Sequence, residues 1–413
     1  MPERKRIILL GSGFAAVMFL KRISLRDYYV TVVSPRNHFL FTPLLPSTTV
    51  GTVEFRSIIE PMRGMRDGDE FIQGTCTEID TEARRITCQS VDPDIPFTLD
   101  YDILIIAVGV RNNTFGIPGV REHAYFLKEL SDARNIRERV VECLERAAIP
   151  GIDPAERDRL LHFVVVGGGP TGVEFAAELH DLFEEDLKKT YPELRPFVRI
   201  TLFEAAKTIL NSFDEDLRHY TTDLFARNGI SVRLGTPVEE IGEDHMKLKG
   251  GEIVRTGLVV WSTGNGPSDL ITSMKAEKDR AGRLITDDHL RLLDHPEIFA
   301  LGDCATVAGS SLPQTAQLAM QEGKYLAKLL NRRARGKDDT APFQFNNLGM
   351  LAYVGDSRAL AEIPKARLRW RGILTYFFWR SAYLTRLVTF KNKVLVFMDW
   401  LKTWLFGRDL SKF

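Results

Sequence analysis

The chain has 413 residues, of which 44% are hydrophobic and 27% charged, and its 55 basic residues balance 55 acidic ones. This length allows two or three domains, and the composition is that of a soluble globular protein, with no run of the roughly 18–20 apolar residues that a membrane-spanning helix requires. Four cysteines, Cys76, Cys88, Cys143 and Cys304, form neither a C-x-x-C pair nor a metal-ligand spacing, so we expect free thiols and no metal site.

Residues 4–33 predict a strand, a helix and a second strand. The apolar run Ile7–Leu10 ends at Gly11-Ser12-Gly13, a helix is expected from Phe14, and Tyr29–Val33 is the second strand. A glycine turn of this kind lets the backbone approach a pyrophosphate, which lies at the helix N-terminus. The segment therefore predicts a dinucleotide site, although an alanine replaces the third glycine.

The second strand departs from the usual dinucleotide fingerprint. It ends in Ser34, where a carboxylate normally binds the ribose, and Pro35 and Arg36 follow. A serine hydroxyl bonds a ribose more weakly than a carboxylate does. Arg36 could instead favour a 2′-phosphate or lie over an adenine ring, and both interpretations stay open at this point.

Two features follow before the middle of the chain. The apolar loop that contains Thr42 and Pro43 is either a packed loop or a rigid wall beside a flat cofactor. Residues 71–106 alternate like antiparallel strands, with a turn at Asp92–Pro96. They run into Val108-Gly109, a small-residue turn that fits a further backbone approach to the first dinucleotide.

A second and complete glycine motif follows a predicted helix at 120–148. The strand Phe163–Val166 breaks at Gly167-Gly168-Gly169-Pro170-Thr171-Gly172, and a helix starts at Val173. A single motif of this type is a weak signal because glycine turns are common. Two such motifs in one chain indicate that electrons pass between two nucleotide cofactors.

The strand after this motif carries the acidic residue that the first site lacks. Val198–Phe203 closes on Glu204, whose carboxylate can accept bonds from both ribose hydroxyls and repel a 2′-phosphate. The second site should therefore prefer NADH to NADPH. A later strand, Gly257–Ser262, runs into Thr263-Gly264, the same device as at Val108-Gly109.

A third strand-to-turn junction and a long helix come next. The short run from Ile298 ends in Gly302-Asp303, where an aspartate can bond a sugar-alcohol hydroxyl, and a helix is expected over Thr315–Leu330. Gln317 and Gln321 lie four residues apart and share a face of that helix. Spacing alone favours ordinary helix glutamines.

The C-terminal region is basic and aromatic. From Lys365 onward 11 Lys/Arg face two acids, whereas the rest of the chain has 44 basic and 53 acidic residues. Four of the five tryptophans lie in 369–413, and Phe397, Trp400, Leu401, Trp404 and Leu405 form an apolar stripe at helical spacing. These features predict amphipathic helices that lie in a membrane interface, or that pack on the body or on a second subunit.

At this point the residues resemble a known family. The Gly11-x-Gly13 turn, Val108-Gly109 and Gly302-Asp303 are similar to the FAD half of two-dinucleotide-binding flavoproteins with the glutathione-reductase-like fold. Four segments resemble the type II, non-proton-pumping NADH:quinone oxidoreductases, above all those of fungal and plant mitochondria. They are SPRNHFLFTPLLPS (34–47), VVVGGGPTGVEFAAEL (164–179), LPQTAQLAMQEGKYLAKLL (312–330) and FQFNNLGMLAYVG (343–355).

The resemblance implies two sets of binding residues. For non-covalently bound FAD they are Gly11, Gly13, Phe14, Ala15, Ser34, Pro35, Arg36, Thr42, Pro43, Val108, Gly109, Asp303, Thr315 and Ala316. For NADH they are Gly167, Gly169, Thr171, Gly172, Glu204, Thr263 and Gly264. It also implies that Gln317 and Gln321 belong to the quinone site, and that Glu174 lies near the flavin and nicotinamide and handles protons.

We therefore expect an α/β fold of two Rossmann-like domains with a C-terminal amphipathic helical membrane anchor. The expected boundaries are residues 1–115 and 285–345 for the FAD domain, 116–284 for the NADH domain and 346–413 for an anchoring and dimerisation region. The expected partners are NADH, ubiquinone or menaquinone, a membrane surface and a second copy of the chain, without nucleic acid. The expected location is the inner membrane of a mitochondrion, or the cytoplasmic face of a bacterial one, with no leader peptide before the first glycine turn.

Two alternatives remain at the sequence level. A sulfide:quinone oxidoreductase shares the fold and the tail but needs cysteines at the flavin, for which Cys304 beside Asp303 keeps the question open. A flavoprotein of the apoptosis-inducing-factor type would use NADH mainly to switch partner binding. A disulfide reductase is excluded, because no C-x-x-x-x-C follows the first helix.

Overall fold

The computed structural model describes residues 4–92, 94–337, 341–366 and 368–411. The chain forms two compact units, each assembled from three segments. The first unit comprises Met1–Leu40, Glu60–Arg111 and Asn265–Asn347, and the second comprises Phe41–Ile59, Asn112–Gly264 and Leu348–Phe413. The expected α/β class with two dinucleotide-binding folds is confirmed.

The first unit is built on a sheet that contains ten strands among the described residues. In spatial order these are β22 (Ala305–Val307), β19 (Leu284–Thr286), β20 (Arg291–Leu292), β21 (His295–Ala300), β8 (Ile103–Ile106), β1 (Lys5–Leu10), β2 (Tyr28–Ser34), β5 (Glu70–Asp80), β6 (Arg85–Ser90) and β7 (Pro96–Asp100). The strands from β21 to β5 run parallel, and β6 and β7 continue as an antiparallel meander. The predicted turn at Asp92–Pro96 joins β6 to β7, and its residue 93 lies outside the described residues.

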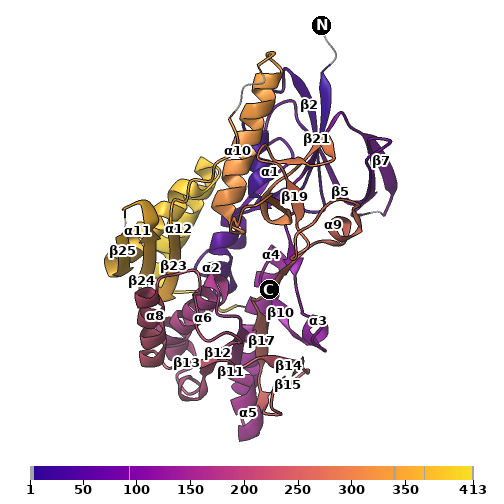
Figure 1. Cartoon of the computed structure of the whole chain (residues 1–413). Helices are drawn as coiled ribbons and strands as arrows, with labels where there is room; N and C mark the ends of the chain where they lie inside the picture. Colours follow the sequence, from indigo (N-terminus) through magenta and orange to yellow (C-terminus); the bar gives the residue numbers. More distant parts are fainter. Residues whose placement is uncertain (1–3, 93, 338–340, 367, 412–413) are drawn as a thin grey trace. The chain divides into compact units, whose positions relative to one another are not determined.

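Helix α1 (Phe14–Leu20) and helix α10 (Ala316–Arg333) lie side by side in this unit (Figure 1). Their backbones approach closely at Gly323, where an added Cβ would lie 2.2 Å from the Ala15 carbonyl oxygen. The short helix α9 (Asp269–Ser273) packs into the core of the same unit through Leu270 and Ile271. Because these apolar side chains are buried here, residues 265–284 belong to the first unit and not to the predicted NADH domain.

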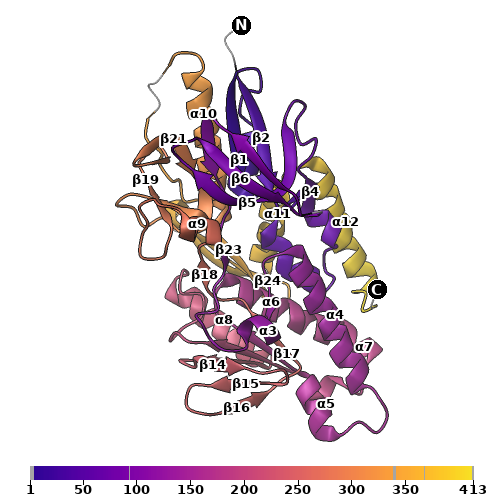
Figure 2. The same ribbon diagram turned by 90° about the vertical axis from the view of Figure 1, so that its right-hand side faces the viewer.

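Among its described residues, the second unit is built on a sheet of five parallel strands, β10 (Tyr125–Phe126), β17 (Leu258–Trp261), β11 (His162–Val166), β12 (Arg199–Glu204) and β13 (Ile230–Leu234). An antiparallel meander follows β13 in the chain and is visible in Figure 2, formed by β14 (Val238–Ile241), β15 (His245–Leu248) and β16 (Ile253–Arg255). The helices between strands are α3 (Val120–His123), α4 (Leu130–Ala147), α5 (Pro154–Leu160), α6 (Pro170–Leu182), α7 (Lys188–Thr190) and α8 (Glu215–Arg227). The helix predicted over 120–148 is therefore interrupted, because Tyr125 and Phe126 pair with β17.

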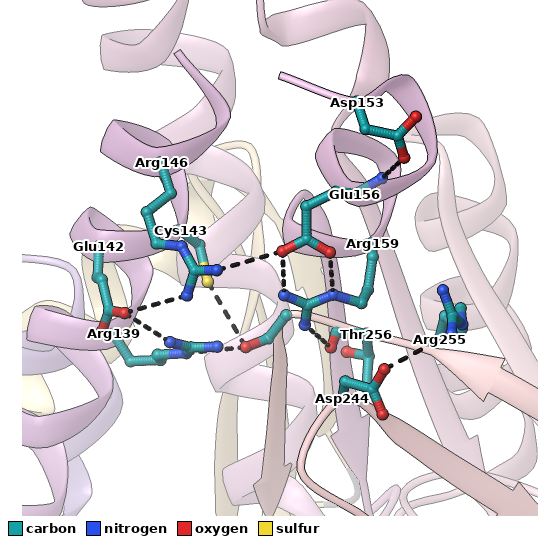
Figure 3. Close-up of polar contacts among 11 residues, drawn as sticks. Arg139, Glu142, Cys143, Arg146, Asp153, Glu156, Arg159, Asp244, Arg255 and Thr256 are labelled. Carbon is teal, nitrogen blue, oxygen red and sulfur yellow. Dashed lines mark hydrogen bonds and ion pairs between the residues drawn. The ribbon is translucent and has the colours of Figure 1, made fainter. Parts of the chain in front are cut away.

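A polar network fastens α4 and α5 to the strand ends of this sheet (Figure 3). Glu156 forms ion pairs with Arg159 at 2.7 Å and Arg146 at 3.2 Å. Arg159 also donates to the Thr256 carbonyl oxygen at 3.0 Å, and Arg139 donates to the Gly257 carbonyl oxygen at 2.9 Å. The network holds the segment before β17 in place, and the Thr263-Gly264 turn follows that strand.

The C-terminal segment forms part of the second unit. It contains β23 (Met350–Gly355), β24 (Arg358–Ile363), β25 (Leu368–Gly372), α11 (Ile373–Arg386) and α12 (Phe390–Phe406). Helix α2 (Leu45–Thr49) also belongs to this unit. Four short strands complete the description: β3 (His38–Leu40), β4 (Ile59–Pro61), β9 (Arg111–Asn112) and β18 (Asn265–Gly266).

Candidate functional site

The first glycine turn has the geometry that a dinucleotide phosphate requires. Gly11 has φ +109°, and an added Cβ would lie 2.3 Å from the Ala107 carbonyl oxygen, so only glycine is accommodated. Gly13 stands at the N-cap of α1, where an added Cβ would meet nothing within 4 Å and no side chain caps the helix. The N–H groups of the first turn of α1 are thus left for a ligand. Phe14 and Ala15 start α1, and the Phe14 ring packs edge-on against another aromatic ring of the unit.

A small polar cluster lies beside this turn, at the end of β2. The Ser34 hydroxyl lies 3.0 Å from the Ser12 hydroxyl, and Arg36 Nε donates to Ser12 Oγ at 3.3 Å and to the His38 carbonyl oxygen at 3.0 Å. Pro35 accepts a bond from a neighbouring glutamine through its carbonyl. Burial and the Arg36 charge lower the pKa of His38 to about 4, so this imidazole is neutral at physiological pH.

Two further glycines open the same region to a cofactor. Gly109 follows β8 and Val108 with φ +66° and open space around an added Cβ, and Gly302 has φ +71°. The Gly302 N–H donates to the Glu322 carboxylate at 2.6 Å. Burial raises the pKa of Glu322 to about 8. Sequence reasoning assigned Glu322 no role at this turn, because a glutamate six residues into a helix carries no signal that it reaches a backbone amide.

Helix α10 begins where the sequence predicts. The Thr315 side chain caps it by accepting from the Leu318 N–H at 3.3 Å, Ala316 is its first residue, and Asp303 accepts at its backbone carbonyl from a loop glutamine. The Gln321 side-chain amide donates through Nε2 to the Asn346 carbonyl oxygen and accepts at Oε1 from the Asn346 N–H, each at 2.9 Å. Gln321 therefore holds the chain segment that follows α10.

The second glycine motif has the same arrangement as the first, with protein atoms close to two of its glycines. Gly167 has φ +116°, and an added Cβ would lie 2.8 Å from the Cβ of Thr263. An added Cβ at Gly172 would lie 2.0 Å from the Gly167 carbonyl oxygen, whereas at Gly169 it would meet nothing within 4 Å. Gly169 is the N-cap of α6 without a side-chain cap, and Thr171 lies in the first turn. The open side of this turn is therefore available to a diphosphate.

The Glu204 carboxylate lies against this turn. It accepts from the Gly168 N–H at 2.6 Å and from the Ala206 N–H at 2.7 Å, one bond to each oxygen. Each oxygen keeps a lone pair for a further donor. Gly264 lies at the same end of the sheet. It has φ +78°, and an added Cβ would lie 2.7 Å from the Asn113 carbonyl oxygen.

Thr42 and Pro43, which the sequence predicts to bind FAD, lie in a short 3-10 helix of this second unit.

A row of buried carboxyl groups follows the glycine motif along α6. Glu174 is buried, accepts from the Tyr353 N–H at 3.1 Å, and burial raises its pKa to about 8. Glu178, one turn further, accepts from Ser47 at 2.6 Å and Thr52 at 2.8 Å, and burial raises its pKa. Glu174 is therefore protonated at neutral pH, which the sequence could not reveal.

An arginine after α12 offsets the negative charge of this row. Arg408 is buried and donates to Thr52 at 3.0 Å, to Asp186 at 2.9 Å and to Glu185 at 2.7 Å. The surrounding carboxylates raise the pKa of Arg408 despite its burial. The contacts anchor the C-terminal segment to the π-helix Phe183–Leu187, which follows α6.

The cysteines do not form a sulfur-chemistry site. All four are buried and free, and burial raises the pKa of Cys304 to about 12. Its thiol donates to the Leu301 carbonyl oxygen at 3.2 Å, which further marks it as a protonated structural group. The antiparallel pairing of β5 with β6 places Cys76 opposite Cys88, although their sequence spacing did not indicate that they are neighbours.

Comparison with known proteins agrees with this geometry. Residues 5–323 match the pyridine nucleotide-disulphide oxidoreductase family, and residues 347–409 match the NDH2 C-terminal domain. A probable NADH dehydrogenase of Dictyostelium discoideum is 45% identical over 100% of this chain and 92% of that protein. External NADH-ubiquinone oxidoreductase 2 of Saccharomyces cerevisiae mitochondria is 39% identical over 99% of this chain and 82% of that protein.

Solved structures give the same result. NDH2 of Plasmodium falciparum in complex with NADH superposes with a TM-score of 0.94 at 28% identity, and the match covers 99% of this chain and 100% of that one. The sulfide:quinone oxidoreductase of Aquifex aeolicus, at 19% identity and a TM-score of 0.73, shares the fold. The glycine turns with open Cβ positions and the uncapped helix start fit FAD in the first unit. This protein belongs to the type II NADH dehydrogenases, FAD-containing oxidoreductases that do not pump protons.

Proposed function

We propose that this protein oxidises NADH at its second unit and delivers two electrons to ubiquinone, as a peripheral protein of the mitochondrial inner membrane. Relatives from Saccharomyces cerevisiae and Yarrowia lipolytica are named as mitochondrial NADH-ubiquinone oxidoreductases. FAD, when bound, supplies the hydride acceptor and the two-electron donor. The chain's own residues supply binding, selectivity and proton handling.

The observation that carries the choice of NADH is the position of Glu204. Its carboxylate is bonded to Gly168 N–H beside the open glycine turn and has a free lone pair on each oxygen. Such a carboxylate accepts bonds from ribose hydroxyls and repels a 2′-phosphate. The residues named for NADH, from Gly167 to Gly264, line the same end of the parallel sheet.

The decisive experiment is an anaerobic titration of the FAD-loaded protein. NADH should bleach the flavin absorbance, NADPH at equal concentration should not, and a short-chain ubiquinone should restore the colour. Bleaching without reoxidation would leave a flavoprotein that uses NADH as a binding switch. Bleaching by sulfide in place of NADH would establish the sulfide:quinone alternative.

Glu174 is proposed as the proton donor for the quinone. The overall reaction is NADH + H⁺ + quinone → NAD⁺ + quinol, so one proton enters from solvent in each turnover. A carboxyl group with a pKa of about 8 holds a proton at neutral pH and can release it to a stronger base. Gln317 is proposed to contact the quinone, and Gln321 is proposed to position it through its two bonds to Asn346.

The C-terminal helices are proposed to lie on a membrane. Trp379 and Trp400 pack together inside the unit, with ring centroids 6.3 Å apart. Trp400, predicted to belong to a membrane-facing stripe, thus faces the protein, whereas Leu374, Trp404 and Phe406 are 86%, 78% and 83% exposed. No helix in the described part of the chain is long and apolar enough to cross a bilayer. Amphipathic helices with exposed aromatic residues and basic neighbours bind the interface instead.

The membrane proposal is tested with two exposed residues. The variant Trp404→Ser/Phe406→Ser should fold normally but lose sedimentation with vesicles that contain anionic lipid. Deletion of residues 369–413 is a poorer test, because it also removes the buried Trp379 and Trp400. A homodimer is proposed as well, and analytical ultracentrifugation of both proteins shows whether the same face joins two copies.

A further inference from the structure

A basic hollow lies in the first unit. None of the residues that line it belongs to either glycine turn. The hollow encloses about 320 Å³ between the end of α1 and the second half of α10, helices that run side by side in Figure 1. Its lining residues are Arg22, Lys324, Lys328, Asn331, Arg332 and Arg335. Five of these six are cationic and none is acidic.

The charges follow one face of α10 at helical spacing. Lys324, Lys328 and Arg332 lie four residues apart, and like charges at this spacing repel each other. The helix dipole attracts cations only near the last turn, which ends at Arg333. The dipole therefore accounts for the positive charge at Arg332 but not for the charges at Lys324 and Lys328.

Four of the five cations have no carboxylate partner within the described part of the chain. These four, Arg22, Lys324, Lys328 and Arg335, are exposed, and no ion pair involves any of them there. Partial burial, and next the charge of Arg22, lower the pKa of Lys324. Outside its basic C-terminal region the chain has an excess of acids, 53 against 44 basic residues, so this gathering of cations runs against the surrounding composition.

Hydrogen bonds fix the geometry of the hollow. The Asn331 side chain accepts from the Ser24 N–H at 2.8 Å and donates to the Arg22 carbonyl oxygen at 2.8 Å. Arg66 donates to the Leu20 and Ile23 carbonyl oxygens at 2.8 and 2.5 Å. The turn after α1 is thereby held against α10, and the backbone of Arg22 keeps its place opposite the lysines.

We propose that this hollow binds a ligand with two or more adjacent phosphate groups. Guanidinium groups recognise phosphate oxygens in pairs, and lysines add point charge, so a row of both matches a short polyphosphate. The ligand differs from the two dinucleotides, whose phosphates meet backbone amides at helix N-termini. A bound polyanion would tie α1 to α10, the two helices that start at the flavin-binding turns, and would stabilise the first unit.

The test uses the full-length, FAD-loaded protein with inorganic triphosphate as the probe. Calorimetry and thermal melting should show binding and a higher Tm. The variant Lys324→Gln/Lys328→Gln should weaken binding roughly tenfold or more, as expected for the loss of two charged contacts. The matched control is Lys275→Gln/Arg280→Gln, which removes two exposed charges of the same unit outside the hollow and should bind as the unchanged protein does.

A second arm separates a soluble ligand from a lipid headgroup. Vesicles with and without phosphatidylinositol 4,5-bisphosphate, whose two ring phosphates are adjacent, are sedimented with both variants. Each variant also carries Trp404→Ser/Phe406→Ser, so that the C-terminal helices do not hold the protein on the membrane. Loss of triphosphate binding alone identifies a soluble polyphosphate, and loss of binding to the bisphosphate lipid identifies a lipid headgroup. If neither probe distinguishes the hollow variant from its control, or neither binds at all, the proposal is wrong.

Discussion

At the scale of single residues, burial decides chemistry more than residue type does. Glu174 and Glu204 are glutamates at the start of α6 and the end of β12, yet their surroundings differ. Glu174 is buried, and burial raises its pKa to about 8. Glu204 is half-buried and bonded to two backbone amides. The first is suited to hold a proton, and the second to hold a substrate.

Glu174→Gln should make the protein less sensitive to alkaline pH. The pKa of Glu174 is raised from 4.5 to about 8, so its contribution to stability is complete below about pH 4.5 and is lost as pH rises toward about 8. The amide has no such dependence, and the difference amounts to roughly 5 kcal/mol at most. Chemical unfolding from pH 5 to 9 measures it, with Glu243→Gln, an exposed carboxylate of the same unit, as the control. Parallel pH curves for Glu174→Gln and the unchanged protein would contradict the assignment.

Glu204→Gln should weaken discrimination between NADH and NADPH. Loss of the negative charge removes both a charged acceptor for the ribose hydroxyls and the repulsion of a 2′-phosphate. Charged hydrogen bonds contribute about 1.5–3 kcal/mol, so KM for NADH should rise roughly tenfold or more while KM for NADPH falls. Steady-state assays with both nucleotides check this. Glu240→Gln, an equal charge change on an exposed strand residue, should leave both values as they are.

At the scale of elements, two helix contacts separate structural glycines from cofactor-binding ones. Gly323 lets α10 pack on α1, whereas Gly13 faces open space at the N-terminus of α1. The sequence presents both as glycines near helices. Only the packing shows that one contacts protein and the other is exposed to a ligand.

Gly323→Ala should destabilise the protein whether or not FAD is bound. Its Cβ would lie 2.2 Å from the Ala15 carbonyl oxygen, so the helices must separate. Overpacking of this kind typically costs about 1–3 kcal/mol. Thermal melting with and without added FAD should show the same loss.

Gly13→Ala should behave in the opposite way. Its backbone has φ −84°, which alanine adopts readily, and its Cβ would meet no protein atom within 4 Å. Stability of the FAD-free protein should therefore be retained, while FAD affinity falls because the methyl group occupies the phosphate approach. Fluorescence titration of the FAD-free protein with FAD distinguishes the two glycine variants.

At the scale of the whole molecule, charge is segregated along the chain. The region from Lys365 onward carries 11 basic and two acidic residues, and its helices α11 and α12 expose large apolar side chains. Both features support the membrane proposal, one through electrostatics and the other through burial of apolar surface.

Vesicle binding should therefore have two separable parts. Raising the salt concentration from 0.1 to 1 M shortens the screening length from about 10 to about 3 Å and should weaken binding to anionic vesicles several-fold. The remaining binding should depend on Trp404 and Phe406. Sedimentation at both salt concentrations, with Trp404→Ser/Phe406→Ser alongside, measures each part. Vesicle binding that does not change with salt concentration would show that the basic residues do not face the lipid.

The sequence was sufficient for the features that depend on local pattern. Glycine spacing, strand and helix periodicity and the strand-end Glu204 predict two dinucleotide folds, because tight turns beside phosphates admit few residue types. The family resemblance extended this to the cofactors and the reaction class. The division between domains could not be predicted at 41–59 and 265–284, because burial of Leu270 and Ile271, and the bonds from Ser47 and Thr52 to Glu178, join segments far apart in the chain.

Only the tertiary structure decided the protonation and packing of particular side chains. The raised pKa values of Glu174 and Glu322, the inert thiol of Cys304 and the buried face of α12 at Trp400 all arise from neighbours distant in sequence. The local sequence pattern determines which backbone conformations and turns are available, so these features can be predicted from the sequence. Desolvation depends on what folds over a side chain, and that is determined only when the chain is packed.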